Sequence, residues 1–110
     1  MNQKNLYFKR NENARLFHYK INHHRNVIYL NTGNSLEHER KKFEVAYAIQ
    51  AEGHEFITEA EFKTPEGKIG RVDVVNLDTG ICIEILSSEK EESIAKKKEF
   101  YPLPIEIIRA

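Results

Sequence analysis

Two apolar segments, Arg71-Val-Asp-Val-Val-Asn76 and Ile81-Cys-Ile-Glu-Ile-Leu86, decide the fold of this chain. Both are rich in β-branched residues, and the Leu77-Asp78-Thr79-Gly80 sequence between them is typical of a tight hairpin turn. If Asn76 faces Ile81, the register places Asp73 directly opposite Glu84. Opposed residues on one face have Cβ atoms about 4.5–5.5 Å apart, close enough for two carboxylates to share a divalent cation.

The other face of this hairpin is expected to be core, because side chains alternate along a strand. The residues on that side are all apolar: Val72, Val74, Ile81, Ile83 and Ile85. Without a cation, two carboxylates so close together repel each other, which raises the pKa of one of them. Alternatively, Asp73 and Glu84 lie on a solvated face, which is common in antiparallel sheets.

Composition limits the class of protein. The 110 residues include 17 basic and 17 acidic side chains, so any nucleic-acid partner must be bound by local patches. The single cysteine, Cys82, excludes a disulfide framework and fits a reducing compartment. No apolar stretch approaches the ~20 residues needed to cross a bilayer, and the N-terminus does not resemble a signal peptide. We therefore expect one soluble, cytoplasmic domain over residues 1–110 that does not bind membranes.

The order of the expected elements indicates a mixed α/β (α+β) fold. Three β-like segments at 6–9, 15–21 and 26–30 predict a β-hairpin or meander extension within residues 1–34. Residues 35–110 form the expected core of helix, three strands, helix and strand, arranged as a mixed sheet flanked by helices. Its segments are a helix at 36–52, strands at 55–62, 71–76 and 81–86, a helix at 88–100 and a strand at 105–108.

The first core helix has good boundaries and two distinct faces. Ser35 is a suitable N-cap and Gly53 a suitable stop. The apolar stripe predicted to face the core contains Leu36, Phe43, Ala46, Tyr47 and Gln50, widened by Val45 and Ile49. Another face carries Glu37, Lys41 and Glu44, which either serve a site or form solvated pairs.

These elements and acids resemble the PD-(D/E)XK nuclease superfamily, also called restriction-endonuclease-like, over residues 35–109. The family carries an Asp on its second core strand and a Glu-x-Lys on its third, usually with a Glu from the first helix. Asp73 and Glu84 match the two strand acids. The segment Ser35-Leu-Glu-His-Glu39, leading to Gly53-His-Glu-Phe56, is similar to the Ser-x-Glu-His start of competence-protein-like members. By this resemblance Glu37 is the first-helix metal ligand, and Glu44 is the alternative.

The resemblance implies an Mg²⁺- or Mn²⁺-dependent endonuclease that cleaves DNA rather than RNA, in the manner of junction, flap or repair nucleases. The carbonyl of Ile85 would complete the metal shell beside the acids. The position of the family lysine holds Leu86, which cannot polarise water, so a lysine must come from elsewhere. Lys41 is the first candidate and Lys68 the second, followed by Lys96 and Lys97. Expected phosphate contacts are Arg40, Lys42, Arg71, Lys97 and His38.

Two other interpretations remain open. Leu86 favours a catalytically inactive protein that keeps the fold and binds nucleic acid or a protein partner. The aromatic residues of the N-terminal segments suggest a homodimer interface, which is compatible with either function. They are Tyr7, Phe8, Phe17, Tyr19 and Tyr29.

Overall fold

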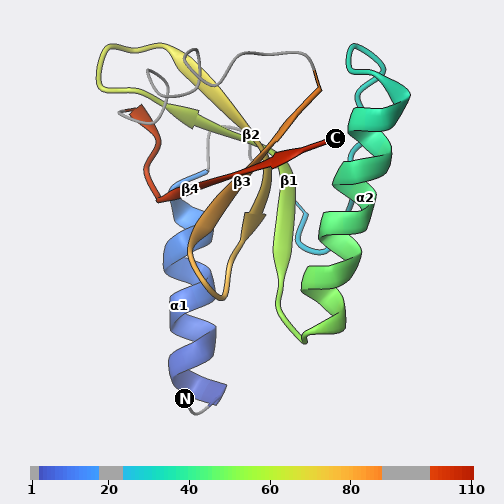
Figure 1. The fold of residues 1–110 in the computed structure, drawn as a ribbon. Coiled ribbons are helices and arrows are strands. Elements are labelled where there is room, and N and C mark those ends of the chain that lie inside the picture. Colours follow the sequence, from blue (N-terminus) through green and yellow to red (C-terminus); the bar gives the residue numbers. More distant parts are fainter. Residues whose placement is uncertain (1–2, 18–23, 88–99) are drawn as a thin grey trace.

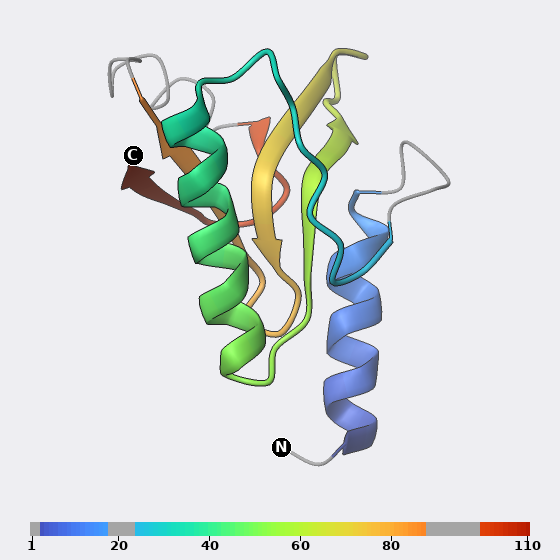
Figure 2. The same cartoon turned by 90° about the vertical axis from the view of Figure 1, so that its right-hand side faces the viewer.

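The computed structural model describes residues 3–17, 24–87 and 100–110. In this part of the chain a four-stranded sheet lies between two helices, one on each face (Figures 1 and 2). The elements are α1 (Gln3–Arg15), α2 (Leu36–Ala51), β1 (Phe56–Lys63), β2 (Ile69–Asn76), β3 (Ile81–Leu86) and β4 (Ile105–Arg109). The prediction of a mixed fold of helices and strands is confirmed.

The strands lie in the order β1-β2-β3-β4. β1, β2 and β3 pair antiparallel, whereas β4 is parallel to β3, so the predicted mixed sheet is confirmed. The helix predicted at 88–100 lies outside the described residues, apart from Phe100.

The β2–β3 hairpin has the predicted register. The pairs are Val74 with Ile83, Val75 with Cys82, and Asn76 with Ile81. Gly80 closes the turn by donating its N–H to the Asn76 carbonyl at 2.9 Å, and its φ of 72° is a conformation that glycine adopts without strain. The turn between two apolar runs was therefore sufficient to fix the strand pairing.

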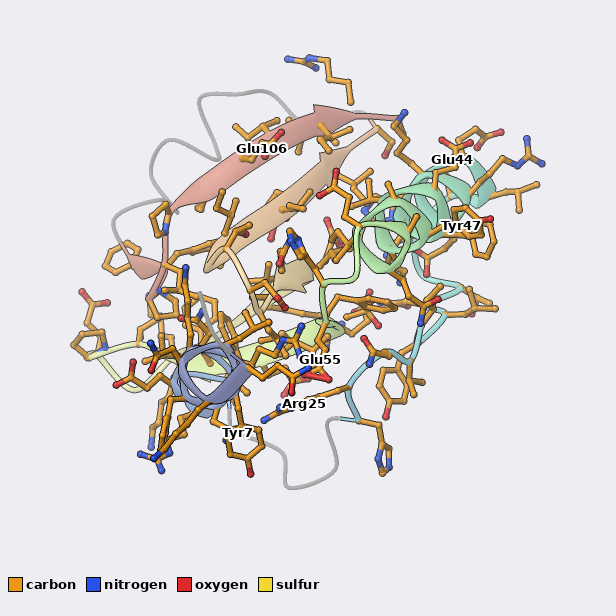
Figure 3. All side chains as sticks on the ribbon, turned by 90° about the horizontal axis from the view of Figure 1, so that it is seen from below. Tyr7, Arg25, Glu44, Tyr47, Glu55 and Glu106 are labelled. Atoms are coloured by element: carbon orange, nitrogen blue, oxygen red, sulfur yellow. The ribbon has the colours of Figure 1, made fainter. Side chains whose placement is uncertain are left out.

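The N-terminal prediction of a β-rich extension is wrong, because residues 3–15 form helix α1. This segment contains no β-branched residue, glycine or proline, so nothing in it opposes a helix. One side of α1 is anchored to the β2–β3 turn: Arg10 Nε donates to Asp78 at 2.9 Å, and Asn13 donates to the Leu77 carbonyl at 2.7 Å. Tyr7 instead points away from the sheet (Figure 3).

The other two predicted N-terminal strands are also absent from the described residues. Arg15 ends α1, and residues 18–21 of the segment 15–21 lie outside the described ranges. Residues 27–30 run beside β1 without forming a strand, because their hydrogen bonds go partly to a side chain. Tyr29 donates its N–H to Thr58 Oγ1 at 2.9 Å, and Thr58 donates to the Val27 carbonyl at 3.0 Å.

Helix α2 begins and ends near its predicted boundaries. Ser35 accepts the His38 N–H at 3.1 Å as N-cap, and Gly53, with φ 82°, follows the last turn. The predicted core stripe is largely wrong, however. Leu36, Phe43 and Tyr47 are exposed by 66, 53 and 65%. The buried side consists of His38, Glu39, Lys42, Ala46 and Ile49.

Charge pairing explains this reversal. Ala46 and Ile49 pack against the sheet as expected of apolar residues, and the helical repeat then places Glu39 and Lys42 on the same side. These two can be buried because Lys42 Nζ lies 2.7 Å from Glu39 Oε1. Figure 3 shows Tyr47 and Glu44 on the outer side of α2.

The apolar core has one part on each face of the sheet. On the α1 side, Phe17 packs with residues such as Phe62, Val72 and Cys82. Phe17 is therefore core rather than the dimer contact proposed from sequence, and Tyr19 lies outside the described residues. On the α2 side the cluster contains Ala46, Ile49, Phe56, Val74, Ile83 and Ile85. Among the described helices, none is long and apolar enough to cross a membrane.

Candidate functional site

A polar pocket of about 390 Å³ opens where the N-terminal end of α2 meets β2 and β3. The N-terminus of α2 and the end of β3 lie on the same side of the molecule, at the top of Figures 1 and 2. The side chains that give the pocket its chemical character are His38, Arg71, Asp73, Glu84 and Tyr101, and Ile85 also lines it. The hairpin, the first core helix and the approach to β4 thus converge on one site.

Asp73 and Glu84 both line this pocket, but the direct cross-strand pair expected for them is not among the pairs that β2 and β3 form. The paired ladder stops at Val74 and Ile83, and the Asp73 carboxylate instead accepts the Ile85 N–H at 2.8 Å. Burial raises the pKa of Asp73; the Ile85 N–H and His38 oppose this shift, while Glu59 adds to it.

Tyr101 fixes Glu84 from the β4 side. Its hydroxyl donates to Glu84 Oε1 at 3.0 Å. Burial and the neighbouring Glu84 carboxylate raise the pKa of Tyr101, so the phenol keeps its proton as a donor. Sequence reasoning did not find Tyr101, and no motif around it indicated a role.

A break in the β1–β2 ladder lies opposite Asp73. Thr58 pairs with Val74 and Ala60 with Val72, but Glu59 between them has φ 50°, a left-handed conformation uncommon for a non-glycine residue. Strained backbone of this kind often occurs at functional sites.

The break also changes which way the side chains face. Val72 packs on the α1 side, whereas Val74, Ile83 and Ile85 pack on the α2 side, so the single apolar face predicted for all of them is wrong. Asp73 therefore faces α2 together with its neighbour Val74.

His38 lies between two carboxylates. Its Nδ1 is 2.9 Å from Glu39 Oε2, and its Nε2 is 3.3 Å from Asp73 Oδ2. Only 6% of the residue is exposed. The first-helix side chain that meets the strand acid Asp73 is thus an imidazole.

Lys42 lies beneath the pocket and is wholly buried, with 0% exposure. Its ammonium donates to Glu39 at 2.7 Å, Glu59 at 2.8 Å and the Tyr29 carbonyl at 2.7 Å. Burial alone would raise the pKa of Glu39, but hydrogen bonds from Lys42, the Asn31 N–H and His38 lower it below its ordinary value. Lys42 is therefore a structural cation, and the phosphate contact predicted for it is wrong for this conformation.

Glu39 and Glu59 were missed from sequence. Glu39 could have been found, because it shares a helical face with Ala46 and Ile49, which are small or apolar and suited to burial. Glu59 gave no such signal, because its inward position depends on the irregular backbone of β1.

Several predicted residues are not in the pocket. Glu37 is exposed, and Glu44 pairs at 3.6 Å with Lys41 on the outer part of α2. Arg40 and Lys68 are also exposed, and Lys68 borders a different pocket from the one that holds the acids. Lys96 and Lys97 lie outside the described residues.

Arg71 is the predicted basic residue that does reach the site. It lines the pocket with about half of its side chain exposed, and it pairs with Glu61 at 3.2 Å and Glu59 at 3.5 Å. Leu86, which stands where the resemblance expects a lysine, is 2% exposed and belongs to the interior.

The balance of charge favours a cation in the pocket. In the part of the chain that the structure describes, the nearby carboxylates outnumber Lys42 and Arg71: they are Glu39, Glu59, Glu61, Asp73 and Glu84. Oxygen donors of this kind suit Mg²⁺ and Mn²⁺. Across residues 3–17, 24–87 and 100–110, however, no three or more His, Cys, Asp or Glu side chains are already grouped as metal ligands. A cation would compete with the Ile85 N–H and the Tyr101 hydroxyl for the carboxylate oxygens.

Comparisons with protein-family models, curated proteins and solved structures find no match to this chain. Its chemistry must therefore be inferred from the pocket itself.

Proposed function

We propose that this protein is a metal-dependent endonuclease of the PD-(D/E)XK type that hydrolyses phosphodiester bonds in DNA in the cytoplasm. The observation that carries the proposal is that Asp73 and Glu84 line one pocket, with the Ile85 backbone beside them. The mixed sheet, with three antiparallel strands after α2 and a β4 parallel to β3, supports the proposal, and the second core helix that the resemblance expects lies outside the described residues.

The residues present fit a divalent cation. Asp73 and Glu84 supply carboxylate oxygens, and the Ile85 carbonyl is the third expected oxygen donor. When bound, such an ion supplies Lewis-acid stabilisation of the phosphate and lowers the pKa of a bound water. We assign Mg²⁺ or Mn²⁺ because both accept a few carboxylates and keep several waters.

Other pocket residues orient these ligands and receive the substrate. Tyr101 holds Glu84 by its 3.0 Å hydrogen bond, which limits the rotamers of that carboxylate. The half-exposed guanidinium of Arg71 is held by Glu59 and Glu61, and we assign to it the contact with a DNA phosphate. In this proposal Arg71 binds the phosphate, which is one of the two roles that the lysine has in the family.

A second candidate is a catalytically inactive protein of the same fold that binds nucleic acid or a protein partner. The observation that favours it is the burial of Leu86 together with Lys42. Neither position offers an ammonium group to the pocket.

A cleavage assay distinguishes these functions. Supercoiled, branched and single-stranded DNA are incubated with the protein and Mg²⁺ or Mn²⁺, using wild type, Asp73→Asn and Glu37→Gln. We expect cleavage by wild type and Glu37→Gln but not by Asp73→Asn, because Asp73 lines the pocket and Glu37 is an exposed acid outside it. Equal activity of wild type and a folded Asp73→Asn would refute the nuclease, and binding of DNA without cleavage would favour the second candidate.

A further inference from the structure

The imidazole of His38 has a defined hydrogen-bonding partner on one side and the pocket on the other. Glu39 Oε2 lies 2.9 Å from Nδ1, while Nε2 is directed at Asp73. With one oxygen bound to the Lys42 ammonium and the Asn31 N–H, the Glu39 carboxylate is a fixed acceptor. Glu39 therefore favours the tautomer with the proton on Nδ1.

In that tautomer Nε2 is an acceptor that faces another acceptor. Asp73 Oδ2 lies 3.3 Å from Nε2, and the same oxygen already accepts the Ile85 N–H. A positive charge between Nε2 and this carboxylate oxygen, either a second ring proton on His38 or a metal ion, would turn the contact into an attractive one. Two ligands at right angles around an octahedral ion, each about 2.1 Å from it, lie about 3 Å apart.

The surroundings of His38 are those of a metal-ligating histidine. Such histidines commonly donate the other ring N–H to a carboxylate, which fixes the ring orientation and raises the basicity of the ligand. Glu39 provides this contact, and the buried ammonium of Lys42 in turn holds Glu39 and Glu59 in place. The buried cluster of Glu39, Lys42 and Glu59 thus orients the His38 ring so that Nε2 faces Asp73.

We propose that His38, and not Glu37, is the ligand that α2 contributes, and that the site consequently prefers a first-row transition ion such as Mn²⁺ over Mg²⁺. This rests on the cation site of the proposed function, but not on catalysis. Imidazole nitrogen suits transition ions, whereas Mg²⁺ prefers oxygen donors. Replacing the expected Glu37 carboxylate by an imidazole therefore shifts the selectivity of the site.

Calorimetric titration with MnCl₂ and with MgCl₂ tests this proposal on the full chain. The proteins are wild type, His38→Gln, Asp73→Asn and the matched control Glu37→Gln, each checked for folding by circular dichroism. We expect wild type to bind Mn²⁺ more tightly than Mg²⁺. His38→Gln should lose about tenfold or more of the Mn²⁺ affinity, with little change for Mg²⁺. Glu37→Gln should match wild type for both ions.

Pulsed electron paramagnetic resonance of the Mn²⁺-loaded wild type adds a readout that needs no folded variant. A ¹⁴N coupling from a directly bound imidazole is expected, and it should disappear in His38→Gln if that variant folds. Absence of the coupling, or unchanged Mn²⁺ affinity in His38→Gln, overturns the role of His38. If Asp73→Asn still loses Mn²⁺, the carboxylate site of the proposed function survives that result. If Mn²⁺ binds through His38 but DNA is not cleaved, the nuclease fails and the ligand assignment stands.

Discussion

Replacing Lys42 by methionine should strongly destabilise the protein. Lys42 is fully buried, and its ammonium neutralises Glu39 and Glu59 at 2.7 and 2.8 Å. Methionine keeps most of the length of the apolar stem but leaves both carboxylates buried without their cation. Removing one partner from a buried ion pair costs about 3–5 kcal/mol.

That loss is large for a chain of this size. Small domains have a free energy of unfolding of about 5–15 kcal/mol, so Lys42→Met should remove about a third to a half of a mid-range value. At about 4 °C per kcal/mol, the melting temperature should fall by about 12–20 °C. Adding Glu39→Gln to Lys42→Met should restore part of the stability, because it removes one of the uncompensated charges.

Urea unfolding followed by circular dichroism measures this effect, and the neighbouring lysine provides the control. Lys41 is paired with Glu44 at 3.6 Å on the surface, so Lys41→Met should cost about 0.5 kcal/mol or less. If Lys42→Met and Lys41→Met unfold within about 1 kcal/mol of each other, the buried cluster does not stabilise the fold as inferred.

Three further predictions concern the stability of the fold. Burial would raise the pKa of Asp78, but hydrogen bonds from Arg10 and the Glu55 N–H lower it below its ordinary 3.8. Its stabilising effect is therefore complete above pH 3.8 and lost as the pH falls through the lowered folded pKa. In Asp78→Asn the free energy of unfolding should fall less steeply as the pH is lowered. An unchanged slope of this free energy against pH would contradict the role of the Arg10–Asp78 pair. Gly70→Ala should cost about 1–3 kcal/mol in urea unfolding, because its Cβ would clash with the ring of Phe62. In the double variant Gly70→Ala/Phe62→Leu, the loss of unfolding free energy should be smaller than the sum of the two single losses. Strictly additive losses would argue against the contact between the two positions. Leu86→Lys should destabilise the protein without bringing an ammonium group into the pocket, since Leu86 is 2% exposed. A stable and more active Leu86→Lys protein would show that this position faces the pocket.

The β2–β3 hairpin was predictable because it depends on residues that are close together in the sequence. A turn with Asp and Gly between two β-branched runs favours the register that pairs Asn76 with Ile81, and the hairpin has this register. The ends of α2 were predictable for the same reason, since Ser35 and Gly53 act on backbone groups close to them in sequence.

What could not be predicted depends on contacts between distant residues. Lys42 can face the sheet because it forms an ion pair with Glu59 on β1. The residue pattern of α2 alone does not reveal this contact with a distant strand. The reversal of side-chain direction around Asp73 results from the left-handed backbone at Glu59. Residues 6–9 of helix α1 were mistaken for a strand because their aromatic residues suggested β-structure, although the absence of β-branched residues in 3–15 indicated otherwise.

The most direct measurement is anomalous diffraction from crystals of the full chain grown with Mn²⁺. We predict one strong anomalous peak between the carboxylates of Asp73 and Glu84, within about 2.3 Å of an oxygen of each, as expected of direct coordination. A well-ordered pocket without such a peak, or a peak bound elsewhere on the protein, would contradict the cation site on which the proposed nuclease depends.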